Sequence, residues 1–411
     1  MLSTDKLRGH SIMAGITVIK IVLAALCCLD TTTAWPFTTR QSLTLETVQK
    51  QAYDNAIKVL DGTLSDGLTN RVSTCNKNTL AVRKEFGNLS KDERKDYTKA
   101  VLCLLKAPSK LPAGKYPGAK SRYDDFTVVH MNMTPSVHST ANFLHWHRYY
   151  VWAYETALRN ECQYQGYQPY WDWSKYPDIV NSPIFNGDEW SMGGNGDPVT
   201  HSGMQLGQNQ IPAGPGGGCV TKGPLANLTI HLGPLMSTMD PRLGIKPNPL
   251  SSGYGDNPRC HRRDVNNFFT KDYLKPADLL KHITSNSDIL KFQDTLQQTN
   301  PSVAALHIGG HYSIWGDPGG DVYVSPNEPA FWLHHGQVDR HWWMWANYDE
   351  GKIKARTSMY DGGTNWMNPN SAKGKSTDLQ WLDVTAPAGK NGLASKEFFS
   401  TTAGPFCYIY Q

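Results

Sequence analysis

Apolar residues recur at the spacing of a helix face in several separate segments of the chain. Ser90-Lys91-Asp92-Glu93 opens one segment as a capping box, and Asn300-Pro301 precedes another as an N-cap followed by proline. Glu328 lies near the start of a further expected helix, where the positive end of the helix dipole favours a negative charge. The pattern therefore predicts a mainly helical fold. The expected helices cover residues 45–60, 90–106, 140–162 and 306–312, and another begins near 327–329.

Two other stretches break this pattern. Residues 186–259 are rich in Gly, Pro and Asn, which predicts long surface loops inside one domain. An apolar run over 16–29, preceded by Lys6 and Arg8 and too short to span a membrane, is typical of a signal peptide. We expect residues 1–34 to be removed, leaving 35–411 as a single domain of a secreted, extracellular protein.

Composition agrees with secretion and excludes one class of partner. The net charge is only +4 and no basic stripe is interleaved with aromatic residues, so we expect no nucleic acid partner. Without Cys27 and Cys28, six of the eight cysteines remain, enough for three disulfides in any of fifteen pairings. Cys75 with Cys103 is one expected pair. Glycosylation sequons lie at Asn88, Asn132 and Asn227.

Nine of the 14 histidines fall in two windows, residues 130–147 and 307–341. Neither window offers Cys, Asp or Glu at metal-ligand spacing, and imidazole alone suits copper. Each window yields one group of three, so two metal ions could face each other and share dioxygen. A catalytic zinc site usually uses one set of three ligands and no matched second set. The alternative to any metal site is that these histidines are packed in the core or lie on helix surfaces. The two groups are His130, His138 and His147, then His307, His311 and His335.

Helix geometry selects among the histidines of each window. His307 and His311 lie four residues apart on one face, while His145 and His147 point about 200° apart. We choose His147 as the ligand, because apolar residues share its side, and expect His145 to be packed or on the surface. His334 is expected beside the ligands, and His341 on the helix surface. Gly309 and Gly310 each weaken their helix by about 1 kcal/mol, which indicates close approach of another helix or of substrate.

Several sequence stretches resemble the type-3 copper phenol oxidases, that is, tyrosinases and catechol oxidases, and among them the short secreted fungal forms. The resemblance covers residue 75 to the C-terminus, where Tyr408-Ile409-Tyr410 is similar to the Y-x-Y that closes the family's catalytic domain. It implies a four-helix-bundle core that holds two copper ions, with long surface loops and few short strands. The matching stretches are FLHWHRYYVWAYE (143–155), PYWDW (169–173), LHIGGHYSIWGD (306–317) and NEPAFWLHHGQVDRHWW (327–343).

The resemblance also implies roles for other residues. Val322 matches the family's gate position above the copper, Phe331 shields the metals, and Asp339 either orients a ligand histidine or pairs with an arginine. Two positions depart from the family pattern. Ser136 replaces a cysteine that often forms a thioether with the second histidine, and Glu328-Pro329 replaces Asp-Pro.

The expected activity is oxidation of o-diphenols, and of o-aminophenols, to quinones with O2 reduced to water. Hydroxylation of monophenols is expected to be weak, because Ile308 follows His307 where strong hydroxylases carry Asn or Asp. The partners would be a phenolic small molecule and O2, with no membrane, and the protein would be a monomer or homodimer. A tyrosinase with strong hydroxylation, a haemocyanin-like oxygen carrier and a metal-poor relative are the alternatives. We expect no C-terminal lid domain, since 70 residues follow His341 and end in the Y-x-Y.

Overall fold

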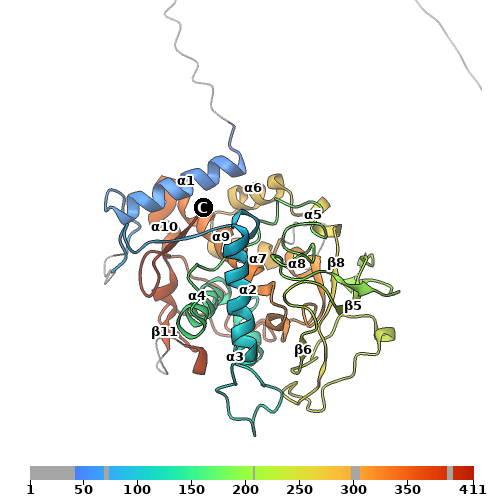
Figure 1. Ribbon diagram of the computed structural model, residues 1–411. Coiled ribbons are helices and arrows are strands. Elements are labelled where there is room, and N and C mark those ends of the chain that lie inside the picture. Colours follow the sequence, from blue (N-terminus) through green and yellow to red (C-terminus); the bar gives the residue numbers. More distant parts are fainter. Residues whose placement is uncertain (1–41, 69–73, 207–208, 298–305, 387–391) are drawn as a thin grey trace, which may run out of the picture. The chain divides into compact units, whose positions relative to one another are not determined.

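The computed structural model describes residues 42–68, 74–206, 209–297, 306–386 and 392–411. The described residues from Leu43 to Gln411 belong to one unit (Figure 1). The expected signal peptide and the N-cap at Asn300-Pro301 lie outside the described residues. Among the residues that are described, no helix is both long and apolar enough to cross a membrane.

Helices form most of the regular structure, as the sequence predicts. The α-helices are α1 (Leu45–Leu60), α2 (Lys91–Lys106), α3 (Arg122–Val137), α4 (Phe143–Cys162), α5 (Phe268–Asp272), α6 (Pro276–Ser285), α7 (Ile289–Gln297), α8 (Leu306–Ser313), α9 (Phe331–Asn347) and α10 (Ile353–Thr357). Short 3-10 helices are η1 (Phe86–Asn88), η2 (Pro241–Leu243), η3 (Ser325–Asn327), η4 (Glu350–Lys352), η5 (Asp383–Thr385) and η6 (Ser395–Phe398).

Helix starts follow from local hydrogen bonds. Ser90 and Glu93 form the predicted capping box of α2, and the Ser90 hydroxyl accepts from the Glu93 N–H at 3.2 Å. Ser121 and Asp124 form a second capping box, which begins α3. Because α3 begins at a fixed residue, the position of His130 along it is also fixed.

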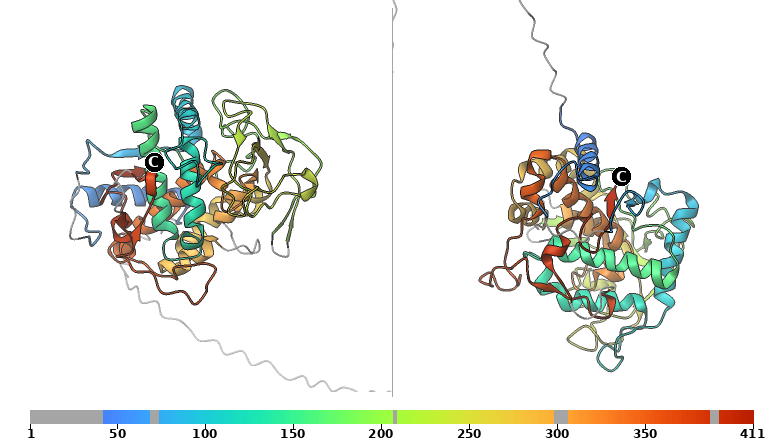
Figure 2. Two further views of the ribbon diagram at one scale, coloured as in Figure 1. Left: turned by 90° about the horizontal axis from the view of Figure 1, so that it is seen from below. Right: turned by 90° about the vertical axis from the view of Figure 1, so that its left-hand side faces the viewer.

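Four helices, α3, α4, α8 and α9, form the core, as the resemblance implies, although α3 was not among the helices expected from the sequence pattern. In Figure 2 the teal and green helices α3 and α4 pack against the orange helices of the second half. Helix α9 lies at the centre, and all its residues from Phe331 to Ala346 are buried. The expectation that His341 lies on the helix surface is therefore wrong, because α9 is covered on every side and has no solvent face for it or for Arg340.

Strands are short and lie mainly in the long loops. One four-stranded antiparallel sheet has the order β2-β5-β8-β9. Strand β1 pairs in parallel with β12, with Ala81 opposite Tyr408, which brings the last residues of the chain into the core. The strands are β1 (Ala81–Arg83), β2 (Gly196–Pro198), β3 (Met204–Leu206), β4 (Asn209–Ile211), β5 (Gly217–Val220), β6 (Thr229–Ile230), β7 (Arg259–Cys260), β8 (Arg262–Val265), β9 (Ile314–Asp317), β10 (Leu379–Gln380), β11 (Leu393–Ala394) and β12 (Tyr408–Tyr410).

Three disulfides connect the six cysteines, as expected in number. The expected pair of Cys75 with Cys103 is wrong, because Cys75 lies beside β1 and reaches the residue preceding β12 instead. The pairs are Cys75–Cys407, Cys103–Cys162 and Cys219–Cys260. The three sequon asparagines, Asn88, Asn132 and Asn227, are exposed.

Candidate metal centre

The first group of histidines comes together at the junction of α3 and α4. His130 lies on α3, His138 ends that helix, and His147 lies on α4. Their ring centroids are 5.1–5.9 Å apart. All three rings are buried, and their side-chain nitrogens are close enough to hold one metal ion.

Backbone carbonyls fix the tautomer of these three rings. The Nδ1–H of His130 donates to the Tyr323 carbonyl at 3.0 Å, that of His138 to Thr134 at 3.0 Å, and that of His147 to Phe143 at 2.7 Å. Each Nε2 therefore keeps its lone pair. The Nε2 atoms of His130 and His147 are buried without a hydrogen-bond partner, as expected of atoms that bind a metal ion.

The second group shows even closer convergence. The Nε2 atom of His311 lies 3.1 Å from that of His307 and 3.2 Å from that of His335. Two imidazole nitrogens bound to one metal ion at about 2.0 Å and a tetrahedral angle lie about 3.3 Å apart. A single N–H on His311 cannot bridge to both neighbours at once. The spacing therefore fits a metal ion better than a hydrogen-bonded cluster.

His334 also lies within this second cluster, but its hydrogen bond argues against a ligand role. The indole N–H of Trp173 donates to its Nδ1 at 3.0 Å, so the neutral ring carries its own proton on Nε2. A Cβ at Gly310 would come within 2.2 Å of the His334 ring. Close approach of α9 thus explains this glycine, as the sequence predicts.

Burial keeps the six imidazoles neutral, the form that binds metal. Desolvation lowers the pKa of His138 to about 4 and of His311 to about 3. It also holds the pKa values of the other four well below the ordinary value, with neighbouring histidines adding to the effect.

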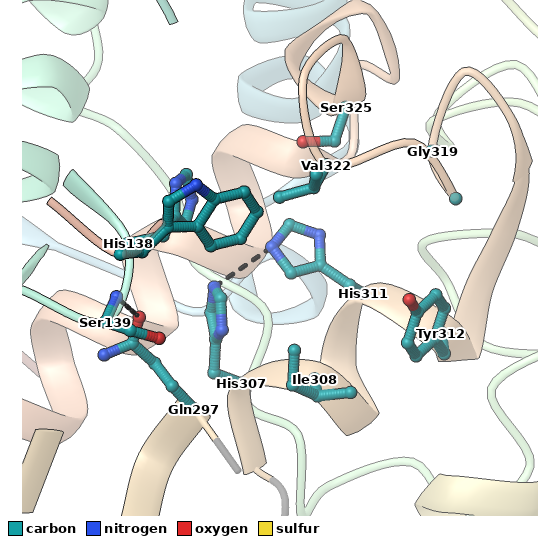
Figure 3. A pocket seen from close by; sticks show the side chains of 12 residues that line it. His138, Ser139, Gln297, His307, Ile308, His311, Tyr312, Gly319, Val322 and Ser325 are labelled. Carbon is teal, nitrogen blue, oxygen red and sulfur yellow. Dashed lines mark hydrogen bonds between the residues drawn. The ribbon is translucent and has the colours of Figure 1, made fainter. Parts of the chain in front are cut away.

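The two groups face each other and share one pocket. The rings of His147 and His335 stack at 4.5 Å with an interplanar angle of 15°. His138 from the first group and His307 and His311 from the second line a pocket of about 120 Å³ (Figure 3). A ligand in this pocket would therefore reach both groups.

Val322 and Ile308 line this pocket, at positions that the sequence singled out. Phe331 packs instead against the ligand rings, 4.1 Å from His335 and 5.5 Å from His130 between ring centroids. It is 1% exposed and is not among the described residues that line the pocket, so it shields the rings from behind.

Other pocket residues were not singled out as site residues from the sequence. They are Ser139, Gln297, Tyr312, Gly319, Gly320, Ser325 and Trp366. Gln297 Oε1 accepts from the Ser139 N–H at 2.8 Å, and its Nε2 donates to the Gln293 carbonyl at 3.1 Å. Nothing in the local sequence marks Trp366, which reaches the site from a distant loop.

Asp339 lies one helical turn beyond His335 and binds arginines and tyrosines. Its carboxylate accepts from Arg148 at 2.6 Å, from Tyr408 at 2.6 Å and from Tyr410 at 2.5 Å, with Arg83 at 3.5 Å. These partners include no ligand histidine, so the arginine pairing that the sequence allowed is the one observed.

Glu328 is buried at the start of α9. Its carboxylate accepts from Arg263 at 2.6 and 2.8 Å, from the His261 ring at 2.6 Å and from the Ala330 N–H at 2.9 Å. Burial raises the pKa of Glu328, but Arg263 and His261 outweigh it and hold the pKa well below its usual value.

Comparison with known proteins supports the interpretation of the two histidine groups as a metal centre. Residues 120–348 match the family model for the common central domain of tyrosinase. The chain is 35% identical to Tyrosinase P of Aspergillus terreus over 80% of this chain and 91% of that protein. It is also 35% identical to an N-acetyl-6-hydroxytryptophan oxidase of Emericella nidulans, over 83% of this chain and 94% of that protein. A mutant polyphenol oxidase from Thermothelomyces thermophila has a similar structure, with a TM-score of 0.79 and 37% sequence identity. The match covers 89% of this chain and 97% of that protein.

Proposed function

The chain belongs to the tyrosinase family, and from this premise we propose that it oxidises o-diphenols, and o-aminophenols, to quinones or quinone imines while O2 is reduced to water. Hydroxylation of monophenols would be weak. The observation that carries the proposal is the pair of three-histidine groups, which face each other across one pocket.

The six histidines would hold two copper ions, three to each ion. His130, His138 and His147 offer Nε2 lone pairs that their Nδ1 hydrogen bonds orient. In the second group the Nε2 spacing of 3.1 and 3.2 Å fits ligands of one ion. When bound, the copper pair would supply the electron transfer from phenol to dioxygen. Phe331 packs against both groups and would exclude water from their buried side.

Residues around the pocket support a preference for diphenols. A monophenol has a pKa near 10 and must lose its proton before hydroxylation, which calls for a base near the metal. Ile308 cannot orient a basic water, and both ends of the Gln297 amide are already hydrogen-bonded. A catechol has a more acidic hydroxyl and needs electron transfer alone.

A tyrosinase with strong hydroxylation is the second candidate, favoured by the similarity to Tyrosinase P. An oxygen carrier is less favoured, because the pocket gives a ligand access to both groups. Steady-state rates on a matched pair, 4-ethylcatechol and 4-ethylphenol, separate the first two candidates. We expect the diphenol to be oxidised much faster. Comparable rates would support the second candidate, and no turnover of either would contradict both.

We also propose that the protein is secreted. The apolar run before residue 34 and the three disulfides support this, since disulfides persist in oxidising compartments. The mass of the protein recovered from the culture medium would test removal of residues 1–34 and glycosylation at Asn88, Asn132 and Asn227.

A further inference from the structure

The pocket next to the histidine groups carries no charged side chain among the described residues that line it. Besides the histidines, the lining is made of apolar, hydroxyl, amide and glycine residues. A charged group on a substrate would therefore lose hydration here without gaining a partner, which is costly.

One polar side chain of the pocket wall, that of Gln297, is already hydrogen-bonded at both ends of its amide. Gln297 and Ser139 bind each other, as described above, and the Gln297 amide donates its proton to Gln293. Within the part of the chain that the structure describes, the hydroxyls of Tyr312 and Ser325 and the buried indole N–H of Trp366 have no hydrogen-bond partner. Figure 3 shows Tyr312 beside Ile308 and His311, while Ser325 lies next to Val322 on the other side of His311.

Tyr312 is the better placed of these two hydroxyls to meet a ring substituent. It adjoins His311 on α8, so a ring held at the histidines would direct its substituent along the wall that Tyr312 forms. A buried acid, Asp321, directly precedes Val322, and its carboxylate already accepts three backbone N–H groups, those of Leu235, Met236 and Tyr323. That negative charge behind the wall would further disfavour an anionic substituent.

We propose that the substrates are catechols or aminophenols with an uncharged, hydrogen-bonding ring substituent such as an amide, and that the Tyr312 hydroxyl determines this specificity. The inference rests on the proposed function and names the substrate class of the same site. Tyr312 would donate its proton to the carbonyl oxygen of the substituent, while the uncharged wall would reject carboxylates.

Three catechols that differ only in the substituent test the proposal: 4-ethylcatechol, 3,4-dihydroxyphenylacetamide and 3,4-dihydroxyphenylacetate. For the copper-loaded protein we expect kcat/KM for the amide to exceed that for the acid at least about tenfold. Tyr312→Phe should lower the amide value about fivefold, as expected for one lost hydrogen bond, and leave 4-ethylcatechol within about twofold. Tyr53→Phe, which removes a hydroxyl from α1 outside the pocket, should change none of the three values.

A binding measurement separates recognition from chemistry. Titration calorimetry without oxygen, where turnover cannot occur, should show the same fivefold weaker binding of the amide to Tyr312→Phe. Equal kcat/KM values for the acid and the amide would overturn the proposal. So would a Tyr312→Phe variant that loses activity equally on all three catechols. Failure of the wild-type protein to oxidise even 4-ethylcatechol would instead contradict the proposed function.

Discussion

At the scale of single residues, the proposed preference for diphenols depends on the pocket wall beside His307. Ile308 presents a branched alkyl group to the pocket, where a polar side chain could hold a water molecule. The imidazoles are neutral, but we assign their lone pairs to copper. The pocket therefore lacks a free base among its described residues, and the proton of a monophenol has no ready acceptor.

Ile308→Asn should raise hydroxylation relative to diphenol oxidation. The amide could orient a water molecule that accepts the phenol proton, and a positioned base contributes at least about tenfold to such a step. We expect the ratio of the 4-ethylphenol rate to the 4-ethylcatechol rate to rise by about that factor. Ile308→Val keeps the wall apolar and serves as the matched control. An unchanged ratio in Ile308→Asn would show that the missing base is not what limits hydroxylation.

At the scale of elements, the first turn of α9 depends on one buried ion pair. Glu328 binds Arg263 through both oxygens and also caps the Ala330 N–H, so it positions the helix that carries His335. Removing one partner of a buried pair leaves the other charge uncompensated. The start of α9 should therefore be sensitive both to substitution and to acid.

Glu328→Gln should lower the free energy of unfolding by about 3 kcal/mol at pH 7. The folded-state pKa of Glu328 lies below the unfolded value of about 4.3, so its contribution is present above pH 4.3 and is lost as pH falls further. The difference in free energy of unfolding between the variant and the wild type should thus shrink by about 1 kcal/mol from pH 4 to pH 3. Urea unfolding at several pH values measures this.

A matched control is Glu350→Gln, which breaks the exposed pair of Glu350 with Lys58. Such surface pairs contribute less than about 1 kcal/mol, so this variant should be close to wild type at every pH. A Glu328→Gln variant that behaves like this control would mean that Glu328 contributes little to the stability of α9.

At the scale of the whole molecule, the C-terminal residues are fastened beside the site to the segment from Cys75 to β1. Cys75 is joined to Cys407, β12 pairs with β1, and Tyr408 and Tyr410 bind the Asp339 carboxylate one turn from His335. The Cys75–Cys407 bridge spans 332 residues, whereas Cys219–Cys260 spans 41. Closing the longer loop removes more entropy from the unfolded chain.

Replacing both cysteines of the longer bridge with serine should destabilise the protein more than the same change in the shorter one. The chain-entropy model gives about 6 kcal/mol as the ceiling for the first and about 4 kcal/mol for the second. Thermal unfolding of the two double variants compares them directly. Equal losses, or a greater loss in Cys219→Ser with Cys260→Ser, would contradict the role assigned to the longer loop.

The sequence predicted the features that local patterns encode. Periodicity and the capping box placed the α2 helix at its observed start, and the i, i+4 spacing put His307 and His311 on one face. It misplaced His341, because a helix surrounded by protein carries no polar stripe to show its outward side. The sequence also did not predict the pairing of Cys75 or the position of Trp366 in the pocket, since both depend on contacts between distant parts of the chain.

Metal analysis of the purified protein tests the central claim most directly, because every role assigned to the pocket depends on two copper ions. The matched variants are His147→Ala from the first group and His335→Ala from the second. His231→Ala is the control, since that ring is half-buried and pairs with Asp256 outside the site.

Elemental analysis should find two copper ions per wild-type chain and two in the His231→Ala control. Each ligand variant should lose copper from its own group, leaving about one ion per chain, and should lose diphenol oxidation while its circular dichroism stays close to wild type. Zinc in place of copper, a single metal ion in the wild-type protein, or full copper content in either ligand variant would contradict the dicopper site.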